Sequence, residues 1–196
     1  MDAISSQVRS IPPRRERIDR DRWISIRPIE RSDAAGLSDF YARLSPESKR
    51  RRFLSYRNPS NRALARAFTE REGEGFVGFL DAPGPNDGAV VAHASLQPDG
   101  HGGAEIAFAV ADELQGHGIG KALMETVVQY ARQLGLRRLS ATLFADNTPM
   151  RRLLHGAGCE IALDQIEAGT EEITLAMCSL TALSPPRRAP RSPSPR

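Results

Sequence analysis

The sequence contains few cysteines, and this scarcity argues against two classes of protein. Only Cys159 and Cys178 are present in 196 residues. Two thiols provide neither a disulfide framework nor the ligand spacing of a zinc site. Both stand in apolar, strand-like stretches, which favours buried structural thiols. We therefore expect no metal site and no disulfide-stabilised scaffold.

Long apolar runs are also missing. No stretch of the chain reaches the roughly 18 apolar residues that a membrane-spanning helix requires. The N-terminus lacks the apolar core of a secretory signal. These two absences predict a cytoplasmic protein without a membrane partner.

The chain is poor in lysine, and its arginines are unevenly distributed. Lys49 and Lys121 are the only lysines among 27 basic residues. The formal net charge is +3, but removing the four arginines of the last thirteen residues leaves −1 for the rest. The folded part is therefore near neutral, which argues against nucleic acid as the main partner.

The polar ends of the chain divide it into three segments. Residues 1–22 are rich in arginine and predict a flexible N-terminal arm. Ser184–Arg196 are almost entirely Pro, Ser and Arg, so residues 181–196 are expected to form a disordered tail that buries no apolar surface. Residues 23–180 then form one domain, which is long enough to bury its own core.

Within this domain, apolar periodicity predicts alternating strands and helices. Period-two patterns indicate strands at residues 23–29, 76–80, 89–96, 104–110, 139–144, 159–166 and 172–178, the last two as a hairpin. Capping residues and helical spacing indicate helices at residues 33–44, 46–54, 61–72, 118–134 and 148–156. Gly135 is expected to end the fourth helix.

The segment Ala104–Gly120, AEIAFAVADELQGHGIG, connects a strand to a helix through a short glycine-containing loop. A helix N-terminus binds anions because its first N–H groups are unpaired and its dipole is positive there. Glycine allows a bulky diphosphate to approach the backbone closely. The loop lacks the Gly-Lys-Ser/Thr ending of a Walker A motif and the spacing of GxGxxG. These features predict a different kind of phosphate-binding loop.

The pattern Gln115-x-x-Gly118-x-Gly120 resembles the Arg/Gln-x-x-Gly-x-Gly/Ala signature of the GNAT superfamily of N-acetyltransferases. Asn147 opens NTPMRRLLHGAGC, which is similar to that family's Asn-x-x-Ala-x-x-Leu-Tyr-x-x-x-Gly-Phe segment. The stretch that begins WISIRPIERSD resembles the catalytic domain of bacterial Pat-type protein lysine acetyltransferases. Over residues 23–180, the resemblance implies an α/β (α+β) fold. Its central sheet is expected to be mixed, mostly antiparallel and twisted, with about 6–7 strands flanked by about four helices.

The resemblance also implies acetyl-CoA as the cosubstrate and no metal. The diphosphate is expected on the backbone amides of Gln115–Lys121 and the pantetheine arm along Phe108–Val110, and Asn147 is expected to face the thioester end or the pantetheine. Asn147 also stands where a helix N-cap is expected, and it can serve both purposes. The expected cofactor-binding residues are Phe108, Ala109, Val110, Gln115, Gly116, His117, Gly118, Ile119, Gly120, Lys121 and Asn147.

Glu105 is the predicted general base. It shares one face of its strand with the small residues Ala107 and Ala109, and in Pat-type relatives a glutamate at this motif position acts as the base. An exposed edge carboxylate or a structural ion pair is the alternative interpretation of Glu105. Leu154 stands where many GNAT enzymes have a tyrosine that protonates the leaving thiolate. The thiolate is therefore expected to leave unassisted or to take a proton from water.

The identity of the acceptor stays open at this level. The acceptor can be read as a protein lysine or as a small-molecule amine, and a third interpretation is a non-enzymatic regulator that binds acyl-CoA.

The run Arg50–Arg52 is either a solvated helix face or a guide for an acidic protein substrate. His93 is expected to be a core or edge histidine. The protein is expected to be a monomer or a homodimer.

Overall fold

The computed structural model describes residues 12–55, 60–70, 74–81 and 88–177. Within them, eight strands form one sheet in the order β1-β2-β3-β4-β5-β6-β8-β7. The strands are β1 (Arg14–Arg17), β2 (Trp23–Pro28), β3 (Gly75–Asp81), β4 (Val90–Pro98), β5 (Gly103–Val110), β6 (Arg138–Phe144), β7 (Glu160–Glu167) and β8 (Thr170–Ala176). Neighbouring strands are antiparallel except for β5 and β6, which are parallel. The predicted mixed, mostly antiparallel sheet is confirmed.

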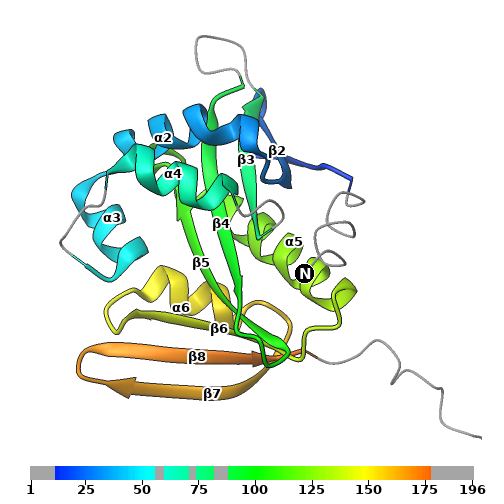
Figure 1. Ribbon diagram of the computed structural model, residues 1–196, viewed down its shortest axis with the longest axis vertical. Coiled ribbons are helices and arrows are strands. Elements are labelled where there is room, and N and C mark those ends of the chain that lie inside the picture. The colour runs from blue at the N-terminus through cyan, green and yellow to red at the C-terminus, as the bar shows by residue number, and fades with distance from the viewer. Residues whose placement is uncertain (1–11, 56–59, 71–73, 82–87, 178–196) are drawn as a thin grey trace, which may run out of the picture.

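Five α-helices and two short 3-10 helices accompany this sheet in the described residues (Figure 1). They are η1 (Arg31–Asp33), α2 (Ala34–Arg43), α3 (Pro46–Phe53), α4 (Asn61–Glu70), η2 (Asp112–Leu114), α5 (Ile119–Gln133) and α6 (Thr148–His155). The predicted helices agree with these bounds to within a few residues. Residues 83–88, whose sequence PGPNDG favours a turn, lie almost wholly outside the described residues, as do Cys178 and the C-terminal tail.

Two successive residues of β4 show how the helices cover both faces of the sheet. His93 contacts Tyr41 of α2, with 2.8 Å between the Tyr41 hydroxyl and His93 Nδ1. Ala94 pairs with Phe76, whose ring meets Tyr130 of α5 at 5.3 Å. Because adjacent strand residues point to opposite faces, α2 and α5 lie on opposite sides of the sheet. His93 is fully buried, as the sequence predicts for a core histidine.

Strand β1 corrects the flexible arm that the sequence predicts for residues 1–22. Arg14–Arg17 pair with β2 antiparallel, from Arg14 opposite Ile26 to Arg17 opposite Trp23. Arg14 also bonds Glu125 of α5 at 2.5 Å, and Arg15 lies 5.0 Å from the centre of the Trp23 ring. The segment has no apolar residue that signals a strand. Its backbone pairing and charged contacts form it, and charge is common on edge strands.

None of the helices in the described part of the chain combines the length and apolar character needed to span a bilayer.

Candidate functional site

The strands β5 and β6 separate along their length and leave an opening in the sheet (Figure 1). Their parallel pairing covers only Gly103–Glu105 against Arg138–Ser140. From Ile106 to Val110, β5 pairs with β4 alone in the described sheet. Its other edge therefore offers backbone N–H and C=O groups to a ligand in the opening, except that the Val110 carbonyl accepts a bond from Gln115 Nε2 at 3.2 Å.

The glycine loop leads into the helix N-terminus beside this opening. Gly116 and Gly118 have φ angles of +81° and +84°, a conformation that favours glycine. A Cβ at either position would meet no atom within 4 Å, so both face open space. Gly118 is the N-cap of α5 and offers no side-chain cap. The first helical bond runs from Ala122 N to Gly118 O at 3.0 Å, so the amides of residues 119–121 have no acceptor within the helix.

A cavity of about 310 Å³ connects the loop with the gap between the strands. It is lined by residues of β5, the glycine loop, the first turn of α5, β6, α6 and α3. Ten of the eleven predicted cofactor-binding residues line it: Phe108, Ala109, Val110, Gln115, Gly116, Gly118, Ile119, Gly120, Lys121 and Asn147. The open glycine loop and this cavity fit a diphosphate-bearing ligand with an extended arm.

His117 is the predicted residue that the main cavity does not include. It lines a smaller hollow of about 200 Å³ on the β1 side of α5, together with Arg14 and Lys121. Its Nδ1 lies 3.0 Å from the carbonyl oxygen of Gln115. The ring therefore lies near the turn of the loop without reaching into the β5–β6 opening.

Glu105 lies at the closed end of the opening. It is exposed and is the last residue of β5 that pairs with β6, where it stands opposite Ser140. On the other side it stands opposite Gln97 of β4. It does not line the cavity, although Ala107, two residues further along the same face, does. No ion pair joins Glu105 to a residue in the described ranges, so the structural ion pair considered above is not formed there.

Asn147 stands at the start of α6. It is 8% exposed, and its side-chain oxygen accepts a hydrogen bond from Met150 N at 3.4 Å. It therefore caps α6 while it lines the cavity. Leu154, in contrast, is fully buried and does not line the cavity. The position where many GNAT enzymes have tyrosine thus belongs to the core in this protein.

Helix α3 contributes lining residues that the motifs did not reveal, namely Ser48, Arg51 and Arg52. Asp112 fixes the start of this helix because its carboxylate accepts bonds from Ser45 N at 2.8 Å and Ser48 Oγ at 2.6 Å. Burial alone would raise the pKa of Asp112, but the bonds from Ser48 and Ser45 lower it overall. Sequence reasoning singled out the run Arg50–Arg52 but not its place in this cavity, and it missed Ser48, because these residues lie more than 60 positions before the loop.

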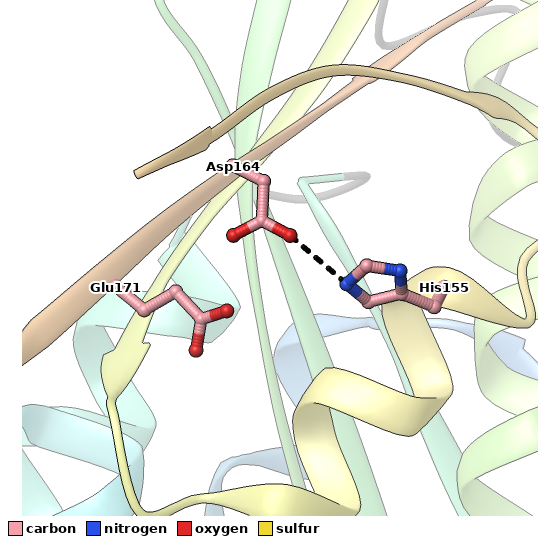
Figure 2. A group of neighbouring side chains, drawn as sticks. All are labelled: His155, Asp164 and Glu171. Carbon is pink, nitrogen blue, oxygen red and sulfur yellow. Dashed lines mark ion pairs between the residues drawn. The ribbon is translucent and has the colours of Figure 1, made fainter. Parts of the chain in front are cut away.

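Beside α6, the side chains of His155, Asp164 and Glu171 gather in a small group (Figure 2). His155 Nε2 lies 3.2 Å from Asp164 Oδ2. Buried Glu171 accepts bonds from Arg151 at 2.5–2.8 Å on both oxygens, and this guanidinium lowers the pKa of Glu171. A metal ion would have to displace Arg151. We therefore interpret the group as an ion-pair network that fastens α6 to β7 and β8.

A helix start with free amides beside two diverging parallel strands can bind a phosphate-bearing ligand, and comparison with known proteins gives the family. The acetyltransferase (GNAT) family profile matches residues 37–158. The chain belongs to this family. It is 33% identical over 140 residues to Acetyltransferase Pat of Mycolicibacterium smegmatis, covering 69% of this chain and 41% of that protein. The chain therefore spans less than half the length of that relative.

Solved structures agree with this assignment. The GNAT domain of S. lividans PAT superposes with a TM-score of 0.64 and 27% identity, over 79% of this chain and 90% of that one. A cAMP-binding acyltransferase from Mycobacterium smegmatis gives a TM-score of 0.52 and 26% identity, over 87% of this chain and 48% of that one. The described fold is that of a GNAT domain.

Proposed function

We propose that this protein is an N-acetyltransferase that moves an acetyl group from acetyl-CoA to the side-chain amine of a protein lysine. The observation that carries the proposal is the cavity, which joins an uncapped glycine loop to the gap between β5 and β6. Membership of the GNAT family supports the reaction class. The resemblance of the stretch WISIRPIERSD to Pat-type protein lysine acetyltransferases favours a protein acceptor.

The residues that would hold acetyl-CoA come from three elements. The amides of residues 116–121 would bind its diphosphate, with Lys121 adding a positive charge. The free edge of β5 from Phe108 to Val110 would pair with the amides of the pantetheine arm. When bound, acetyl-CoA supplies an activated thioester.

The acceptor lysine must lose a proton before it attacks. A free lysine has a pKa of about 10.4, so deprotonation at pH 7 costs about 4–5 kcal/mol. Glu105 would accept this proton, directly or through a water, from an amine at the closed end of the strand gap. Its position on the face of Ala107, with no ion pair in the described ranges, supports this role. Because Leu154 is buried, the leaving thiolate would depart unassisted or take a proton from water.

The Glu105→Gln variant tests this mechanism. We expect its turnover to fall by at least about 10²-fold near neutral pH, because a positioned base contributes about 10²–10⁴-fold. Thiol release from acetyl-CoA should be followed with lysine peptides, and mass spectrometry should locate the acetyl group. Calorimetry should show unchanged acetyl-CoA affinity. Glu167→Gln, which removes an exposed glutamate from β7, is the control for loss of charge.

Two results would contradict the proposal in different ways. Undiminished turnover of Glu105→Gln would remove Glu105 as the base while leaving the reaction intact. Acetylation of small amines but of no lysine peptide would replace the protein acceptor with a small-molecule one.

A further inference from the structure

Arg52 of α3 lines the cavity. It donates to Ser95 Oγ at 2.8 Å. Ser95 is the cross-strand partner of Ala107, which also lines the cavity. The guanidinium also lies 5.1 Å from the ring centre of Phe53 and 5.2 Å from that of Phe68. Two rings and a serine thus fix Arg52 at one position along β5.

The three arginines of this helix differ in their partners. Arg50 and Arg51 each pair with Glu47, at 2.8 Å and 2.6 Å. Arg52 forms no ion pair with any residue in the described ranges, and its Nε is buried without a hydrogen-bond partner. A partly buried guanidinium without an anion is unfavourable, because desolvation of its charge is not compensated.

The polar neighbours of Arg52 do not supply the missing negative charge. Burial, and then the charge of Arg52, hold the pKa of His93 well below its usual value, so His93 is neutral. Burial raises the pKa of Tyr41, so its hydroxyl stays protonated. Neither neighbour carries a negative charge, so an anion that pairs with Arg52 would come from outside this cluster.

We propose that Arg52, oriented by Ser95, is a carboxylate-binding subsite for the amine acceptor, which is a lysine beside an aspartate or glutamate in a peptide. This inference rests on the acetyl transfer proposed above. Glu105 and Ala107 are two residues apart on one face of β5, or about 7 Å. Arg52 bonds Ser95, which stands opposite Ala107, so a lysine with an acidic neighbour would place its amine at Glu105 and the acidic side chain at Arg52. The α-amine of a free amino acid lies too close to its own carboxylate to do so, and free lysine, whose side-chain amine is further from its carboxylate, is therefore included in the test.

The test uses two peptides that differ only in a glutamate or glutamine beside the lysine, with free lysine as a third ligand. Binding to the CoA-loaded full chain is measured by calorimetry, and kcat/KM is measured with acetyl-CoA. We expect the glutamate peptide to bind at least about tenfold more tightly, as hydrogen bonds to charged groups allow. Arg52→Gln should abolish this preference with little change in acetyl-CoA affinity.

Two further variants show whether a loss of the preference comes from the missing guanidinium or from misfolding. Arg52→Lys keeps the charge without the planar fork and should retain part of the preference. Arg66→Gln on α4 removes a 78% exposed arginine and should retain all of it. Melting temperatures identify any variant that fails to fold.

Several outcomes separate this inference from the proposed function. Equal binding of both peptides, no binding of any ligand, or a preference that survives Arg52→Gln would overturn the subsite. A preference in binding that depends on Arg52, without acetylation of either peptide, would support the subsite and contradict the lysine acceptor. Tighter binding of free lysine than of both peptides, again dependent on Arg52, would assign the carboxylate to an amino acid.

Discussion

Two helices begin at the edge of the same cavity, and they begin in opposite ways. Helix α5 starts at Gly118, which has no side chain to cap the first turn. Helix α6 starts at Asn147, whose side chain accepts a bond from Met150 N. Both residues line the cavity. One helix leaves its first amides to a ligand, whereas the other satisfies an amide from within the chain.

The two helix starts therefore have different roles: the start of α5 can bind a ligand, and the start of α6 holds its helix in place. The open start of α5 places a partial positive charge where an anion can approach. The capped start of α6 is additionally fastened by Arg151, which bonds Glu171 of β8. We infer that α6 serves mainly as a fixed wall of the cavity and α5 as its anion-binding end. The following variants test that division.

The largest expected effect is a loss of stability when the ion pair that holds α6 against β8 is broken. Glu171→Gln removes one partner of a pair in which Glu171 is 2% exposed and Arg151 is 32% exposed. Breaking a buried pair costs about 3–5 kcal/mol, and partial exposure of Arg151 places the expected loss near the lower end, about 3 kcal/mol. Urea unfolding measures it. Glu172→Gln, the exposed neighbour on β8, is the control and should change stability little.

The same pair predicts a pH dependence of stability. Arg151 lowers the pKa of Glu171 in the folded protein, so the pair stabilises fully above the ordinary glutamate pKa of about 4.3. This contribution is lost as pH falls below that value toward the folded pKa. The stability difference between wild type and Glu171→Gln should therefore shrink as the pH falls below about 4. A difference that stays constant down to pH 2 (roughly two units below the free pKa) would contradict this assignment.

The second effect concerns the anion-binding start of α5. Gly118→Val places a β-branched side chain in the open space beside the loop and strains a positive φ angle. We expect acetyl-CoA affinity to fall by at least about tenfold, or about 1.4 kcal/mol, in calorimetry. Gly135→Val imposes the same backbone strain at the end of α5, where φ is +68° and a Cβ also meets no atom within 4 Å. If both variants lost affinity equally, strain alone would explain the result.

The smallest expected effect concerns Asn147, and it distinguishes a role in capping α6 from a role in contacting the ligand. Asn147→Ala should cost about 1 kcal/mol of stability, since it removes the N-cap acceptor. Asn147→Ser keeps a capping oxygen and should recover most of that stability. Acetyl-CoA affinity measured on both variants completes the comparison. Recovered stability with persistently weak binding would add a direct ligand contact to the role of Asn147.

Local patterns predicted the central elements well. Gly118, Gly120 and Gly135 marked the bounds of α5, and alternation along Ala104–Val110 marked β5. These signals succeed because caps and strand alternation depend on neighbours in the chain. The prediction missed β1, whose four residues are Arg14–Arg17. A strand formed by backbone pairing and ion pairs carries no apolar period in its sequence.

The sequence by itself determined the family, the order of elements and the glycine loop, because each depends on residue type at short spacing. Only the tertiary structure decided that Asp112 brings α3 to the cavity, that Leu154 is core, and that Arg52 lacks an anion among the described residues. It also placed Glu105 at the closed end of the strand gap. Burial and charge pairing depend on segments distant in the chain, and no local pattern records which of them meet.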